Sequence, residues 1–89
     1  MVTAIVLVNT ERGRVVDVAQ QLIEIDGVSE VFSVAGRYDL VAILRVTDND
    51  RMAELVTGRL LRVEGVAHTE TLTAFKAFSQ HDLERMFGL

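Results

Sequence analysis

The 89-residue chain contains no cysteine, no proline and no tryptophan. Without cysteine it cannot form a disulfide scaffold, a thiolate zinc site or an iron–sulfur cluster. Without proline it has no proline-rich linker and no collagen-like segment. Positive charge is also scarce, since nine basic residues stand against thirteen acidic ones and leave a net charge of −4. Binding to a nucleic-acid backbone requires clustered positive charge, so this balance argues against a direct nucleic-acid partner.

Long apolar runs are missing as well. The longest, Ala4–Val8 and Leu40–Leu44, are far shorter than the roughly 20 residues of a membrane span. No basic stretch precedes the first apolar run, so we expect neither a secretory signal nor a membrane anchor. A composition of 49% hydrophobic and 25% charged residues is typical of a globular domain. These features predict one small cytoplasmic domain.

Two segments of the chain recur 38 positions apart. The run Ala4–Val8 aligns with Ala42–Val46, and Leu22–Val28 aligns with Leu60–Val66. Both matches have the same offset, which indicates the duplication of one unit. A solenoid is excluded because such arrays need at least three repeats.

Each copy of the unit predicts a strand, a helix and a strand. Apolar positions at 3.6-residue spacing predict a first helix over Gly13–Ile25, and Gly27 stops it. Asp48, Asn49 and Asp50 are candidate N-caps of a second helix, which ends before Gly65. Its apolar face is expected to hold Met52, Leu55, Val56 and Leu60. The four strands are predicted at Val2–Val8, Val28–Ala35, Tyr38–Val46 and Val66–Phe78.

The resulting order is βαββαβ. Gly36–Arg37 is the only turn between the second and third strands, and so short a connection predicts an antiparallel hairpin. Right-handed crossovers then place both helices on one face of a four-stranded antiparallel sheet, with the first and third strands central. We therefore predict an α+β ferredoxin-like sandwich in residues 1–78. In the tail, residues 79–89, Ser79–Asp82 resembles a capping box that opens a short helix.

The sheet face away from the helices is also expected to be apolar. The run Leu40–Leu44 is apolar in both directions, and Val31, Phe32, Val34 and Ala35 fall on both faces of the preceding strand. An uncovered apolar face of several hundred Å² is unusual on a soluble monomer. We therefore expect this face to pack on a second copy of the chain, as in a homo-oligomer.

Candidate catalytic groups are few. His68 and His81 lie in different elements without metal-ligand spacing, so neither a metal site nor a cofactor is predicted. His68 would suit a general base in a cleft, or a hydrogen-bonded histidine at a strand edge. Arg12–Gly13–Arg14 would hold an anion at the helix start, or form a solvated turn. The central strands lack the exposed aromatic residues of an RNA-recognition module.

The hairpin between the second and third strands is the most distinctive local feature. Gly36 allows a close approach of backbone N–H groups, Arg37 and Asp39 carry opposite charges, and Tyr38 adds a flat wall. This set suits a zwitterion, although a glycine and polar residues also make an ordinary hairpin. In the fourth strand, alternation places the hydroxyls of Thr69, Thr71 and Thr73 on one side. These threonines either line a site or serve as ordinary strand formers.

At these residues the sequence resembles a known family. Gly36–Asp39 after a valine-rich strand, followed by Gly65–Val66 and Thr69–Thr71, is similar to the effector-binding half of the Lrp/AsnC transcription regulators, the RAM domain. The similarity extends from Val2 to about Phe78. Full-length members carry an N-terminal helix-turn-helix, whereas this chain starts with the first strand of the module. It therefore resembles the stand-alone members, and direct promoter binding does not carry over.

The resemblance implies a function and an assembly. It implies a dimer with facing sheets, a dimeric α/β barrel-like assembly, and further association into rings, commonly octamers. It also implies a small effector, usually an amino acid, bound between subunits and able to bias their assembly. The effector-binding residues would be Gly36, Arg37, Tyr38, Asp39, Thr69, Thr71 and Thr73. Arg37 occupies the variable position of the motif.

The leading hypothesis is thus a non-enzymatic, amino-acid-sensing module that assembles with itself and with full-length Lrp/AsnC regulators. Three alternatives stay open. One is a dimeric ferredoxin-like enzyme of the small monooxygenase or dehydratase type that uses His68. Another is an ACT-like regulatory domain, which shares the element order but pairs edge to edge. The last is a purely structural oligomerisation module in which the hairpin binds nothing.

Overall fold

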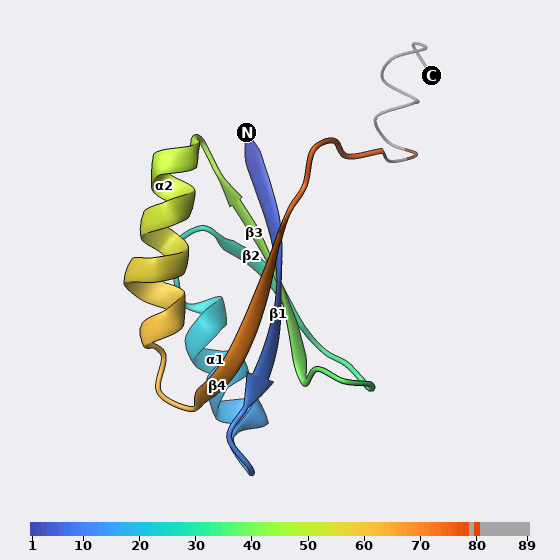
Figure 1. The fold of residues 1–89 in the computed structure, drawn as a ribbon, viewed down its shortest axis with the longest axis vertical. Coiled ribbons are helices and arrows are strands. Elements are labelled where there is room, and N and C mark those ends of the chain that lie inside the picture. The colour runs from blue at the N-terminus through green and yellow to red at the C-terminus, as the bar shows by residue number, and fades with distance from the viewer. Residues whose placement is uncertain (79, 81–89) are drawn as a thin grey trace.

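The computed structural model describes residues 1–78 and residue 80, and its elements follow the predicted βαββαβ order. The elements are β1 (Val2–Thr10), α1 (Val15–Ile23), β2 (Val28–Ser33), β3 (Leu40–Val46), α2 (Asn49–Ala53), the π-helical η1 (Glu54–Arg59), the 3₁₀-helical η2 (Leu60–Arg62) and β4 (Val66–Thr73). The sheet has the order β2-β3-β1-β4 with antiparallel pairing throughout. All helices lie on one face of it (Figure 1). The predicted ferredoxin-like sandwich, with the first and third strands central, is confirmed.

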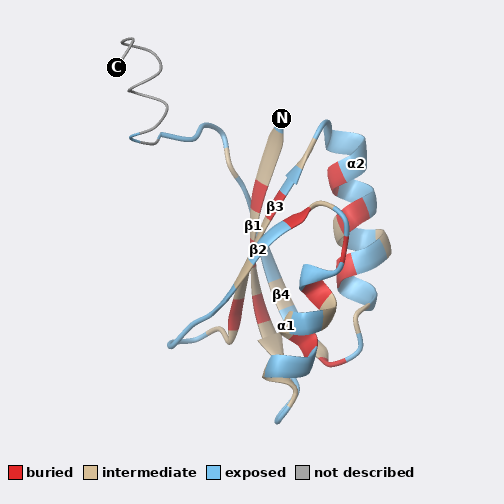
Figure 2. Cartoon of the chain, turned by 180° about the vertical axis from the view of Figure 1, so that it is seen from behind, coloured by how far each residue is buried: buried red, intermediate tan, exposed pale blue. Residues whose placement is uncertain are grey.

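The core lies between the sheet and the helices. Along β1, Ala4, Val6 and Val8 are fully buried, and the residues between them are only half-buried. Figure 2 shows the buried residues along the strands and on the inner sides of the helices. The other fully buried side chains are Val18, Leu22, Leu40, Ala42, Leu44 and Leu60. The alternation along the strands follows from the two-residue period of a β-strand, so one set of residues faces the helices.

The duplication seen in the sequence is also a duplication of geometry. Gly27 and Gly65, which are 38 positions apart, have φ angles of +101° and +100°. Each lies in the loop after its helical segment, and each carbonyl accepts a backbone bond, from Arg45 N at 2.9 Å and from Glu11 N at 2.7 Å respectively. A residue with a side chain is strained at such a φ, which explains why glycine occupies both positions.

The second helical segment begins as predicted and then becomes irregular. Asp48 is the N-cap, and its Oδ1 accepts a hydrogen bond from Arg51 N at 2.8 Å. After Ala53 the α-helix gives way to the π-helix η1, in which the Thr57 hydroxyl donates to Ala53 O at 2.6 Å. Thr57 and the following Gly58 both have a low α-helix propensity, so the sequence here does little to stabilise a regular α-helix over the π-helix. The predicted single helix is therefore three joined pieces.

Two predicted strand boundaries are wrong. The fourth strand ends at Thr73 rather than Phe78. In the described sheet it pairs with β1, and the last backbone hydrogen bond between them runs from Ala74 N to Thr3 O at 2.9 Å. Because β1 begins at Val2, it offers almost no backbone for the residues after Ala74 to pair with. The hairpin turn is also wider than Gly36–Arg37, since β2 stops at Ser33 and β3 starts at Leu40. The predicted tail helix in residues 79–89 lies outside the described residues. In the described part of the chain, no helix has the length and apolar character required to cross a bilayer.

Candidate functional site

The loop between β2 and β3 projects from the sheet on the side opposite the helices (Figure 1). A backbone bond from Val34 N to Asp39 O, 3.0 Å long, closes the loop at its base. Gly36 has a φ of +128°, and an added Cβ would meet no atom within 4 Å. The tip of the loop therefore stands in open space, where its backbone groups are accessible to a ligand.

Asp39 ties the base of this loop to the end of β1. Its backbone N–H donates to Val8 O at 3.0 Å. Its carboxylate Oδ2 accepts one bond from Thr10 N at 2.8 Å and a second from the Thr10 hydroxyl at 3.3 Å. The prediction that Asp39 receives an ammonium group stays a prediction, and the structure gives this carboxylate a role in positioning the loop.

Tyr38 reaches across β1 to the edge strand β4. Its hydroxyl donates to Glu70 Oε2 at 2.6 Å. The hydrogen bond to Glu70 raises the pKa of Tyr38, partial loss of solvation raises it further, and nearby Arg37 opposes the shift. Glu70 was not among the predicted site residues. No local signal reveals this contact, since 32 residues separate the partners and only the sheet topology brings them together.

The three threonines of β4 share one face of the sheet, as the alternation predicted. Thr69, Thr71 and Thr73 lie opposite Val8, Val6 and Ala4, which are buried beneath the helices. The intervening His68, Glu70 and Leu72 consequently project from the other face. Within one chain, the threonines and the pair formed by Tyr38 and Glu70 therefore lie on opposite faces of β4.

The face without helices carries a continuous apolar surface, which confirms that part of the sequence analysis. Ile5 and Leu7 of β1 lie beside Ile43 and Val41 of β3, at positions that alternate with the buried core residues. On the flanking strands, Phe32 is 49% exposed and Leu72 is 45% exposed. We call these six residues the open face.

His68, the residue on which an enzymatic function would depend, is exposed at the sheet edge. It lies on β4 opposite Asn9, where the register of the two strands shifts. The three main cavities of the described residues are lined by other residues. The other histidine, His81, lies outside the described residues.

The fold agrees with comparisons to known proteins. The chain is 36% identical over 59 residues to an uncharacterized HTH-type transcriptional regulator of Pyrococcus horikoshii. That match covers 66% of this chain and 39% of the regulator, so the chain spans well under half the length of this relative. A crystal structure of a Thermus thermophilus protein superposes with a TM-score of 0.83 at 42% identity, covering 90% of this chain and 100% of that one.

A third match shares the fold at low identity. A transcriptional regulator of Neisseria meningitidis, crystallised in complex with L-methionine, gives a TM-score of 0.78 at 18% identity. The match covers 89% of this chain and 53% of that one. The sequence model of the Lrp/AsnC ligand-binding domain matches residues 3–83. The chain therefore belongs to the family of Lrp/AsnC ligand-binding domains.

Proposed function

We propose that the chain is a regulatory module that binds an amino acid and has no catalytic activity. The observation that carries the proposal is the polar hairpin, which projects on the same side as the open face (Figure 1). A second copy packed on that face would lie beside Gly36, Arg37, Tyr38 and Asp39. The L-methionine complex of the Neisseria relative supports an amino acid as the class of effector.

The geometry of β4 supports a site shared between subunits. The hairpin lies on the open-face side, whereas Thr69, Thr71 and Thr73 face the helix side of an edge strand. Within a single chain, the hairpin residues and the three threonines therefore lie on opposite faces of the sheet and do not contact the same ligand. An effector that contacts both sets would have to bridge chains, and such a ligand biases the assembly equilibrium by its differential affinity.

We further propose that this module associates with copies of itself and with full-length regulators in the cytoplasm. The relatives carry a helix-turn-helix in their names, and the net charge of −4 disfavours direct DNA binding by this module. Ligand binding would then reach transcription through a mixed assembly. Size-exclusion chromatography with light scattering, run on mixtures with a full-length regulator from the same organism, tests this step. Elution of the two proteins in separate peaks would contradict it.

The effector proposal is tested by thermal unfolding in the presence of each common amino acid. A ligand bound only to the folded state at 100 times its Kd stabilises it by roughly 2.7 kcal/mol. Arg37→Ala in the loop should reduce the shift, and Lys76→Ala, an exposed cation after β4, serves as its matched control. Asp39→Ala should also reduce the shift, but it removes the bonds to Thr10, so its ligand-free stability must be measured alongside.

The expected result is a shift with one or a few amino acids that persists in Lys76→Ala. If no amino acid changes the unfolding temperature, the sensing proposal is wrong. If the shift survives in both Arg37→Ala and Asp39→Ala, the hairpin is not the site. A purely structural oligomerisation module would be the better account in the first case.

A further inference from the structure

A cavity lies on the helix side of the molecule, away from the hairpin. It has a volume of about 300 Å³ and lies between the α1–β2 loop, the end of β3 and the second helical segment. Its lining contains three arginines and two carboxylates, so it has a net charge of +1 in a chain whose net charge is −4. We call it the arginine pocket. The residues used below are Asp26, Arg51, Glu54, Leu55 and Arg59.

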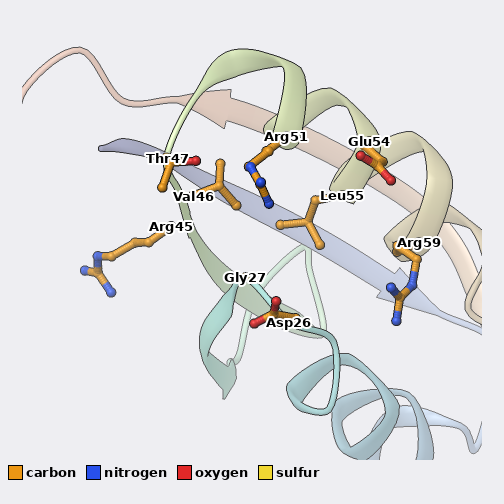
Figure 3. A pocket seen from close by; sticks show the side chains of 9 residues that line it. All are labelled: Asp26, Gly27, Arg45, Val46, Thr47, Arg51, Glu54, Leu55 and Arg59. Carbon is orange, nitrogen blue, oxygen red and sulfur yellow. The ribbon is translucent and has the colours of Figure 1, made fainter.

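The helical wall of the pocket presents two cations with an apolar residue between them. Arg51, Leu55 and Arg59 follow each other at intervals of four residues across α2 and η1, and all three line the pocket. Figure 3 shows both guanidinium groups reaching toward the loop that carries Asp26, with Leu55 between them. The ion pair from Arg51 to Asp48 is long, at 3.8 Å, and its side chains are largely exposed. Arg51 therefore keeps its capacity to bind an anion.

The first half of the duplicated fold places an arginine differently at the equivalent position. There, Arg14 lies across the loop glycine, with its Cβ and Cζ each 3.4 Å from the position of a Cβ on Gly65. Asp17 neutralises that arginine through bonds of 2.6 and 3.0 Å. The nearest atom to each added Cβ is apolar and 2.8 Å away, Val18 Cγ2 at Gly65 and Leu55 Cδ2 at Gly27, but an arginine is among the three nearest neighbours only at Gly65. The first half of the fold therefore holds its arginine in an ion pair beside the loop glycine, at the place where the second half presents the arginine pocket.

The π-helix gives the pocket its shape. It begins at Glu54, carries Leu55 against Gly27, and ends at Arg59. Such widened turns inside α-helices occur frequently at functional sites. Arg51 lies in α2 just before the π-helix and Arg59 lies at its end, so the two arginines stand at opposite ends of this wall, where each can bind one anionic group.

We propose that the arginine pocket binds an amino acid with an acidic side chain. The two guanidinium groups suit the two carboxylates of such a molecule, and guanidinium–carboxylate pairs are strong because they are charge-assisted. Asp26 faces them from the opposite wall and accepts the ammonium group, and Leu55 contacts the short aliphatic chain between the carboxylates. Glu54 supplies the other carboxylate of the lining. This site lies within one chain and does not depend on the hairpin proposal.

The test is calorimetric titration of the full chain with L-glutamate at constant ionic strength. Arg51→Gln and Arg59→Gln should each weaken the Kd about tenfold or more, because each removes one charged hydrogen-bonding partner. Lys76→Gln changes the net charge equally, lies outside the pocket and should leave the Kd within about twofold of its original value. Glutarate, which lacks the ammonium group, should bind more weakly than L-glutamate, and Asp26→Asn should remove that difference.

Three results would overturn the proposal. The first is the absence of saturable binding of L-glutamate. The second is equal weakening by Lys76→Gln, which would mean that the binding reflects overall charge alone. The third is loss of binding in Arg37→Ala with no change in Arg51→Gln, which would place the ligand at the hairpin and leave the proposed function intact. Failure of this proposal is thus distinguishable from failure of the effector site.

Discussion

At the residue scale, the contacts that position the hairpin are made by side chains from distant parts of the sequence. Tyr38 binds Glu70 on the edge strand, and Asp39 binds Thr10 at the end of β1. The sequence predicted Tyr38 and Asp39 as members of a site but not their partners. A pattern of residue types shows which groups a loop offers, whereas the partners depend on the register of strands that the loop does not contain.

The bond between Tyr38 and Glu70 makes a prediction about titration. Because the phenol donates to Glu70, the folded protein holds the pKa of Tyr38 above its ordinary value of 10.0. The bond's contribution to stability is then fully present below pH 10 and is lost as the pH rises through the folded-state pKa. Tyr38 is the only tyrosine and there is no tryptophan, so absorbance at 295 nm reports on it alone.

We expect Glu70→Gln to lower the midpoint of this titration toward 10.0, because it removes the carboxylate acceptor. Glu30→Gln is the matched control, since Glu30 lies on β2 and pairs loosely with Arg45 at 3.7 Å. The control should titrate as the unmodified chain does. An identical midpoint in all three proteins would show that the phenol does not bind Glu70 in solution.

At the element scale, the sequence predicted the helices well where a physical signal marks an end. Asp48 caps the second helical segment as expected. The first helix ends at Ile23, before the predicted Ile25, and Gly27 and Gly65 lie with positive φ in the turns that follow the two segments. The change to a π-helix after Ala53 was not predicted. It depends on which carbonyl each N–H selects within one turn, and side-chain periodicity does not resolve that choice.

Two glycine substitutions test this account of the second helical segment. Gly58→Ala should stabilise the protein by about 0.5–1 kcal/mol, because alanine loses less entropy in a helix and its Cβ would lie 3.8 Å from Glu54 Cγ, an ordinary contact. Gly27→Ala should destabilise it by about 1–3 kcal/mol, because φ is +101° and the new Cβ would lie 2.8 Å from Leu55 Cδ2. Urea unfolding followed by circular dichroism measures both. Two changes of the same sign would contradict the geometry.

At the scale of the whole molecule, the layers followed from the sequence with little ambiguity. The duplication, the order of elements and the apolar character of both sides of Leu40–Leu44 predicted one covered and one open sheet face. The fourth strand was overestimated because its residues remain favourable for a strand beyond Thr73, while the neighbouring strand does not extend far enough to pair with them. Strand length is set by the partner as much as by the strand.

The open face carries the last prediction, which concerns assembly. If the chain forms the homodimer proposed above, we expect Ile43→Glu to dissociate it, because Ile43 lies on a central strand beside Ile5 in the middle of the open face. A two-fold interface would bury two such carboxylates, and an unpaired buried charge costs about 3–5 kcal/mol, so the dimer dissociation constant should rise at least about a hundredfold.

Val16→Glu is the matched control. It introduces the same charge at an apolar residue that is 68% exposed on α1, on the opposite side of the sheet. Sedimentation velocity should give monomers for Ile43→Glu and dimers for the control, with matching circular dichroism spectra. Dimers in both variants would show that the chain associates through some other surface, and monomers in both would tie assembly to net charge instead of the apolar face.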